Sequence, residues 1–197
     1  MNCSRFTEPD TWHGGYYELA IELGPRSESR LRSALTRLWS HPHLEGCYAS
    51  RELDPNAQPH IAPVLTAEPG HLYGLATLPN GVAVACGTCV VREEDGPDWL
   101  DLYLPLGGLG LAYPVGAYPF GAEPTAPSWQ PELDAWFRAI GVFVFQAVPF
   151  ALGVIGFEAS GSVYSHDLSA TGIPSKCGVA LLWPTTSGLL FHPPNVS

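Results

Sequence analysis

An Asn-Gly pair at positions 80–81 lies between two apolar runs and constrains the fold more than any other feature of the sequence. The runs cover residues 71–78 and 82–91 and are rich in aliphatic and β-branched side chains. Because Asn and Gly tolerate the positive φ angles of a tight turn, this pattern predicts a β-hairpin. A second connection at 93–98 leads to an alternating apolar run at 99–105, which predicts a third strand. The three strands should form an antiparallel meander.

Other segments have the periodicity of strands or helices. Residues 15–24 alternate apolar and polar side chains, as a half-buried strand does. Residues 28–39 place apolar side chains at helical spacing behind Ser27, which suits the N-cap position. The same reasoning predicts strands at 44–49 and 150–159, a helix from Pro131, and a closing hairpin of 177–183 and 188–191.

Two segments have no regular period. Residues 51–70 read as a loop, and residues 106–131 are so rich in Gly and Pro that they predict a long ordered loop with aromatic side chains. The order of elements favours an α+β fold with a mainly antiparallel sheet and two helices packed on one face. A ferredoxin-like core with additions is one topology that fits. The length and the 46% of hydrophobic residues predict a single domain over 1–197.

The charge balance argues against nucleic acid as a partner. The net charge is −10, and the nine basic residues, eight Arg and Lys176, are scattered without a run. Binding to a phosphate backbone needs clustered cations, which this chain lacks. An acidic surface attracts basic partners instead.

The cysteines indicate a reducing environment. They are odd in number and dispersed along the chain, at Cys3, Cys47, Cys86, Cys89 and Cys177, so a disulfide scaffold is not expected. Residues 1–10 contain no apolar segment of a secretory signal. We therefore expect reduced thiols and a cytoplasmic location.

One apolar run approaches the length of a membrane span. Residues 139–157 are uncharged, but Gln146 and Pro149 interrupt them and neither flank has a cluster of basic residues. A buried helix followed by a buried strand is the better interpretation, and no membrane association is expected.

Several motifs that could carry chemistry lack the context that chemistry needs. Cys86 and Cys89 form a C-x-x-C, but both fall within a strand, where an offset of three places their side chains on opposite faces unless Gly87 forms a bulge. We interpret them as structural thiols. The spacing of His41, His43 and Cys47 matches no zinc pattern, so no metal site is predicted.

The remaining motifs are weaker still. Three consecutive residues at 165–167, Ser-His-Asp, cannot place a base between a nucleophile and a carboxylate. The glycines at 107–110 lack the rest of a phosphate-binding loop, so no cofactor is expected. Glu158 ends an apolar strand, where burial would raise its pKa, but a strand-end residue that reaches water is the favoured interpretation. No catalytic residue is assigned.

The function hypothesis rests on five carboxylates around one connection, together with the aromatic loop. A basic protein would dock on the acidic side chains, as on an immunity or antitoxin-type protein, and the aromatics would anchor it. The predicted contact residues are Glu93, Glu94, Asp95, Asp98, Asp101, Tyr113, Tyr118 and Phe120. A solvated turn and aromatics that plug the open end of the sheet are the structural alternatives.

The alternative function is an enzyme or a small-ligand-binding protein that uses the thiols, the histidines or Glu158. The two hypotheses differ in how these groups are arranged. A ligand site should gather several of them at one place, whereas a docking protein should leave them dispersed.

Overall fold

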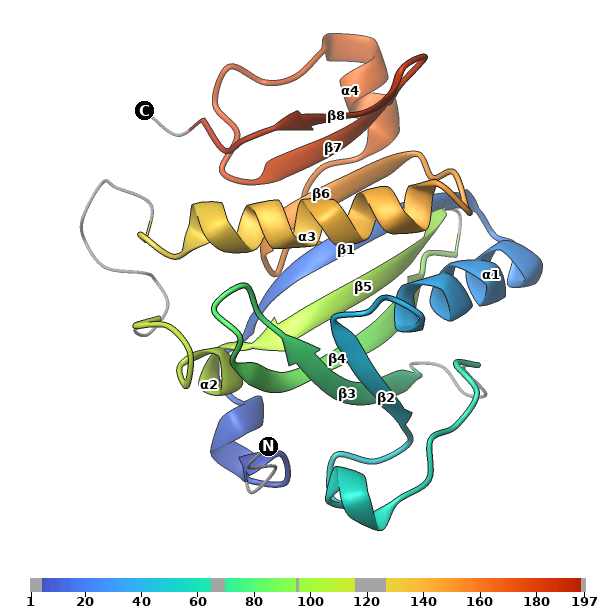
Figure 1. Cartoon of the computed structure of the whole chain (residues 1–197). Coiled ribbons are helices and arrows are strands. Elements are labelled where there is room, and N and C mark those ends of the chain that lie inside the picture. The colour runs from blue at the N-terminus through green and yellow to red at the C-terminus, as the bar shows by residue number, and fades with distance from the viewer. Residues whose placement is uncertain (1–4, 65–69, 95, 116–126, 196–197) are drawn as a thin grey trace.

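A computed structural model describes residues 5–64, 70–94, 96–115 and 127–195. The strands among these residues form one antiparallel sheet (Figure 1). Its strands are β1 (Tyr16–Pro25), β2 (Leu44–Tyr48), β3 (His71–Thr77), β4 (Ala83–Arg92), β5 (Pro97–Pro105), β6 (Leu152–Phe157), β7 (Ala180–Thr185) and β8 (Gly188–His192). The strand order across the eight-stranded sheet is β2-β3-β4-β5-β1-β6-β7-β8. The predicted meander is confirmed, because β3, β4 and β5 are consecutive neighbours.

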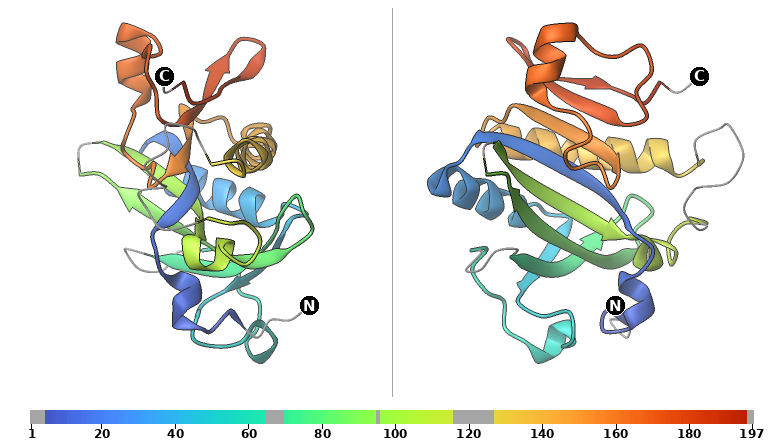
Figure 2. Two further views of the ribbon diagram at one scale, coloured as in Figure 1. Left: turned by 90° about the vertical axis from the view of Figure 1, so that its left-hand side faces the viewer. Right: turned by 180° about the vertical axis from the view of Figure 1, so that it is seen from behind.

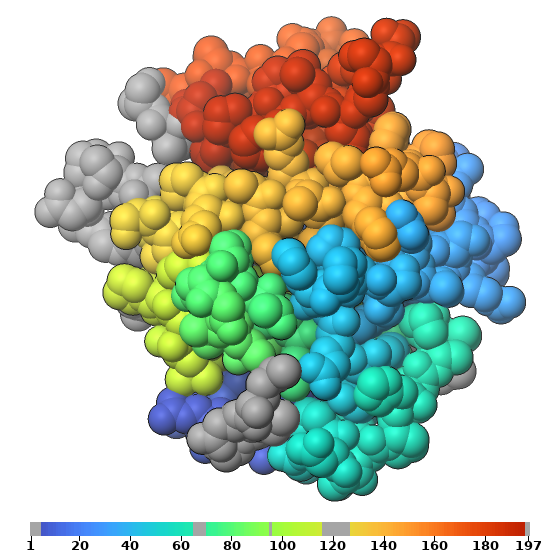
Figure 3. Space-filling model, viewed as in Figure 1, coloured from blue at the N-terminus to red at the C-terminus, as the bar shows by residue number. Residues whose placement is uncertain are grey.

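Two long helices, α1 (Glu28–Trp39) and α3 (Gln130–Phe145), cover the same face of the sheet (Figure 2). In the space-filling view α3 forms a band between α1 and the C-terminal hairpin of β7 and β8 (Figure 3). The short helix α2 (Leu106–Leu109) follows β5, and α4 (Ser165–Thr171) precedes β7. Short 3-10 helices occur at η2 (Pro9–Trp12) and η3 (Pro55–Ala57).

The two long helices that the local sequence pattern predicts are confirmed. Helix α1 has the predicted bounds, and the Ser27 hydroxyl accepts the backbone N–H of Arg30 at 3.4 Å, as an N-cap does. The apolar run at 139–157 divides as expected, into the end of α3 and strand β6. Among the described residues, none of the helices has the length and apolar character needed to cross a membrane.

The ferredoxin-like topology is not confirmed. Such a core contains parallel strands joined by crossover helices, whereas each strand pairing described here is antiparallel. Strands β1 and β2, which precede and follow α1 in the sequence, are not neighbours in the sheet either. Strand β1 lies between β5 and β6, while β2 lies at the far edge of the sheet. The coarser class, an α+β fold dominated by an antiparallel sheet, holds.

The central strand β1 is buried on both sides. Leu19 and Ile21 point into the core beneath α1 and α3, while Glu18 and Glu22 point to the opposite side of the sheet, which we call the second face. At one end of the second face, α4 and its neighbours form an apolar cluster around Trp99. At the other end lies the N-terminal segment, as the view from behind shows (Figure 2), and its aromatic residues form a further buried cluster.

Candidate functional site

Two buried carboxyl groups lie between those two clusters on the second face. Glu18 is on β1 and Asp101 is on β5, and the two residues are 5% and 2% exposed. In the register of these strands Ala20 is opposite Asp101 and Glu18 is opposite Tyr103. The two carboxyls are therefore diagonal neighbours on one face, a spacing that long side chains bridge.

Ser160 joins the two carboxyl groups. Its backbone N–H donates to Glu18 Oε1 at 3.0 Å, and its hydroxyl donates to Asp101 Oδ2 at 2.7 Å. The Cys89 thiol donates to the same Oδ2 at 3.5 Å. All three donors are neutral groups. Asp101 Oδ1 is buried and has no hydrogen-bond partner among the described residues.

Burial without a compensating positive charge raises the pKa of both acids. Desolvation, with the nearby charge of Asp101 as a second cause, raises the pKa of Glu18 from 4.5 to about 8. Desolvation also raises the pKa of Asp101 from 3.8 to about 6, against the hydrogen bonds from Ser160 and Cys89. Near pH 7 the pair therefore retains about one proton.

The chain that holds Ser160 in place makes a tight turn after β6. Glu158 has a φ of 43°, a left-handed conformation that is uncommon for a residue other than glycine. Its backbone N–H donates to Tyr16 O at 3.0 Å. Gly15 has a φ of 82°, and a Cβ there would lie 2.7 Å from the Phe157 ring, so glycine is needed where these segments approach.

A histidine and two tyrosines border the carboxyls. His71 on β3 is exposed, and its Nδ1 lies 3.2 Å from the hydroxyl of Tyr103. The rings of Tyr16 and Tyr103 lie 4.7 Å apart, and Gly87 leaves room for the Tyr103 ring. We call Glu18, Asp101, Ser160 and these neighbours, with Cys89, the carboxyl cluster.

The two cysteines of the C-x-x-C lie on opposite faces, as predicted. Cys86 points into the core under the helices, and Cys89 points to the second face beside Asp101. Burial raises the pKa of both thiols far above the usual value, so neither is a thiolate at neutral pH. That they do not cycle as a redox pair stays a prediction.

The predicted acidic surface is less concentrated than the sequence indicates. Asp98 and Asp101 are both buried, on opposite faces of β5, so they are not surface contacts in this conformation. Asp98 pairs with Arg92, 3.7 Å away, and accepts the N–H of Ser27 at 3.0 Å. These bonds join the β4–β5 connection to the start of α1.

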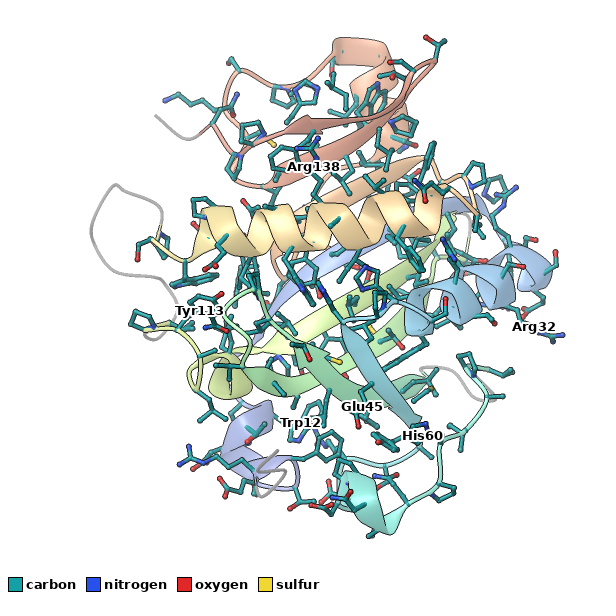
Figure 4. The ribbon with its side chains drawn as sticks, viewed as in Figure 1. Trp12, Arg32, Glu45, His60, Tyr113 and Arg138 are labelled. Atoms are coloured by element: carbon teal, nitrogen blue, oxygen red, sulfur yellow. The ribbon has the colours of Figure 1, made fainter. Side chains whose placement is uncertain are left out.

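The other predicted contacts differ in their surroundings. Glu93 is half-buried and accepts hydrogen bonds from Trp99 Nε1 and the Tyr164 hydroxyl, at 3.1 and 2.9 Å, whereas Glu94 is exposed. Tyr113 is half-buried near α2, and its hydroxyl donates to Glu132 at 2.9 Å (Figure 4). Asp95, Tyr118 and Phe120 lie outside the described residues.

The histidine motif belongs to the packing of α3. The His41 ring packs edge-on against Phe143, and burial lowers its pKa from 6.5 to about 4. Trp136 Nε1 donates to His43 Nδ1 at 3.1 Å. Glu158 is exposed, in keeping with the favoured interpretation. Ser165 begins α4 and binds Glu22 rather than a catalytic histidine.

Sequence reasoning missed Ser160, the two tyrosines and Glu18, and of these Glu18 had a usable signal. The alternation of residues 15–24 predicts that Glu18 is on the polar face of an amphipathic strand, where a carboxylate normally reaches water. A signal was present in the neighbouring strand: Trp99 and Tyr103 flank Asp101 at alternate positions, so the second face also has large apolar side chains to bury. An acid on the strand paired with β5 could then have been recognised as a buried one.

The fold and the carboxyl cluster thus define an antiparallel α+β protein with a buried pair of acids on one face of the sheet. Comparisons of this chain with protein-family models, with curated proteins and with solved structures give no match.

Proposed function

We propose that the protein binds a small organic amine, whose ammonium group is received by the Glu18–Asp101 pair. The observation that carries this proposal is the buried Asp101 Oδ1, which has no hydrogen-bond donor among the described residues. A buried carboxylate oxygen without a donor forgoes a charge-assisted hydrogen bond, and an ammonium group would supply one.

A bound cation would also reduce the electrostatic repulsion between the two carboxylates. Glu18 and Asp101 repel one another, and the donors described around them are neutral. A bound ammonium group attracts both carboxylates and offsets one of their two negative charges, so it favours the doubly ionised state that burial alone opposes. Neutral polar ligands would not relieve this repulsion.

The surrounding side chains suit an organic cation. The faces of Tyr16 and Tyr103 can contact a cation and its alkyl groups. On the side of β3 and β4, the exposed His71 and the half-buried Cys89 border the pair. Asp101 is covered in the present conformation, so binding must displace the turn at Ser160. Thiol catalysis is disfavoured, because the pKa of Cys89 is raised.

Isothermal titration calorimetry with butylammonium chloride tests the proposal, with butanol as the uncharged probe. We expect saturable butylammonium binding that Asp101→Asn weakens at least about tenfold, because a buried charge pair is lost. The matched control Glu94→Gln removes an exposed carboxylate and should leave the affinity unchanged. Affinity should rise from pH 6 to pH 8, since binding releases the proton of Glu18.

The proposal fails if butanol binds as tightly as butylammonium, or if Asp101→Asn binds as the wild type does. Glu18→Gln provides a second variant if Asp101→Asn does not fold. It should weaken butylammonium binding and remove the proton release measured in buffers of different ionisation enthalpy.

Docking of a basic protein remains a second candidate. Its support is the net charge of −10 together with the exposure of Glu94 on the β4–β5 connection. Electrostatic attraction of this kind raises association rates more than affinity. The proposed contact is therefore narrower than the sequence indicates, with Glu94 and the half-buried Glu93 at its centre.

A further inference from the structure

A cavity of about 220 Å³ lies at the C-terminal end of the sheet, away from the carboxyl cluster. It is bounded by β7, by the end of β8 and by the segments that flank them, in the part of the molecule that carries the C-terminus (Figure 1). The lining residues are Ile173, Cys177, Val179, Leu181, His192, Pro193 and Asn195. An apolar protein cavity of about 150 Å³ already holds a benzene molecule, so this volume admits one substituted aromatic ring.

The wall of the cavity is held by hydrogen bonds within the protein. Asn195 N–H donates to Cys177 O at 2.8 Å, and Asn195 Oδ1 accepts the N–H of Cys177 in return. The Cys177 thiol donates to Val179 O at 3.3 Å. These bonds fasten the chain after β8 to the chain before β7, and they engage the polar groups of both residues.

The next feature of the lining is a polar atom that these hydrogen bonds do not include. His192 Nε2 is buried and has no hydrogen-bond partner among the described residues. His192 is opposite Leu181 in the pairing of β7 and β8, so its ring belongs to the same wall as the apolar side chains. A buried ring nitrogen without a partner is costly, and a ligand hydroxyl would provide the missing bond.

The lining also defines the charge of the ligand. Among the described residues that line it there is no Asp, Glu, Lys or Arg, and the side chains other than His192 are aliphatic or already hydrogen-bonded. A charged molecule would lose its hydration here without gaining an opposite charge. The cavity therefore favours an uncharged ligand with a largely apolar surface and one polar group.

We propose that this cavity is a binding site for a small uncharged aromatic alcohol of the phenol class. The ring occupies the space between Ile173, Val179 and Leu181, and the hydroxyl bonds to His192 Nε2. The site is independent of the amine site, because the two share no residue.

Phenol and toluene are the probes, because toluene has a methyl group of similar size in place of the hydroxyl group of phenol. Titration of the full chain, followed by NMR of methyl groups, should show saturable phenol binding with shifts at Ile173, Val179 and Leu181. Toluene should bind about tenfold more weakly, which corresponds to the loss of one hydrogen bond. His192→Phe should abolish the difference between the two probes.

Two further variants locate the site. Ile173→Trp fills the cavity and should prevent binding of both probes, whereas Leu190→Phe changes an exposed side chain of the same hairpin and should have no effect. Equal affinity for phenol and toluene in the wild type, absence of binding, or shifts at other methyl groups would each overturn the proposal. Asp101→Asn should bind phenol normally, so failure of the amine proposal leaves this test intact.

Discussion

At the scale of single residues, the acids of the second face anchor the chain that follows β6. Glu18 and Asp101 accept hydrogen bonds from Ser160, and Glu22 accepts both the N–H and the hydroxyl of Ser165. Carboxylates on one face of the sheet therefore hold a segment of the chain over themselves instead of facing water. This arrangement explains why Glu18 and Asp101 are buried although neither has a cationic donor among the bonds described.

This covering segment could not be predicted from the sequence. Alternation along β1 and β5 correctly indicates which residues share a face, because it depends only on the period of a strand. The cover depends on contacts between residues far apart in the chain: Ser160 is 59 residues from Asp101 and 142 from Glu18. No local pattern encodes a separation of that size.

The raised pKa of Glu18 predicts a pH-dependent stability. A carboxyl whose pKa is about 8 in the folded state and 4.5 when unfolded binds more protons when folded. Its stabilising contribution is complete below pH 4.5 and is lost as the pH rises towards 8. The free energy of unfolding of the wild type should therefore fall between pH 6 and 8, by up to about 1.4 kcal/mol per pH unit.

Urea denaturation of Glu18→Gln measures this contribution. Glutamine cannot ionise, so the fall between pH 6 and 8 should be much smaller in the variant, and its stability relative to the wild type should increase with pH. Glu94→Gln, an exposed control, should follow the wild-type curve. If the curves of Glu18→Gln and the wild type are parallel, Glu18 is not a buried acid of this kind.

At the scale of elements, the sequence predicts the individual helices and strands better than the order of the strands in the sheet. The long helices and the β3–β4 hairpin have strong local signals, namely helical spacing, an N-cap and an Asn-Gly turn. Helix α4 was missed because its seven residues contain a single buried apolar side chain, Leu168, and so have no apolar period. The central place of β1 depends on long-range pairing, which these local signals do not contain.

The β4–β5 connection is the element on which the docking candidate is tested. Glu94→Lys should slow association with a labelled oligolysine peptide several-fold at low salt, because electrostatic steering acts on the rate of encounter. Glu45→Lys on β2 is a matched control, with the same change of charge at another exposed glutamate (Figure 4). Stopped-flow fluorescence measures both rates. Equal slowing by the two variants would indicate an effect of net charge alone and would remove the connection as a docking surface.

At the scale of the whole molecule, α3 links the central sheet to the C-terminal hairpin. Leu182 of β7 is fully buried between two glycines, Gly141 on α3 and Gly153 on β6. Arg138 of the same helix reaches towards β8 (Figure 4), with its guanidinium carbon 5.2 Å from the centre of the Phe191 ring. The helix can lie this close to β7 because position 141 has no side chain.

Gly141→Ala tests this close approach. In an exposed helix the change from Gly to Ala stabilises by about 0.5–1 kcal/mol, because glycine loses more conformational freedom on folding. Here the new Cβ would lie 2.4 Å from Leu182 Cδ1, and overpacking in a core costs about 1–3 kcal/mol. We expect a net destabilisation of about 1–2 kcal/mol by urea denaturation. Leu182→Val shortens the opposing side chain, so the double variant should be more stable than the sum of the two single effects. A stabilised Gly141→Ala variant, or strictly additive effects, would show that α3 does not rest on β7 as described.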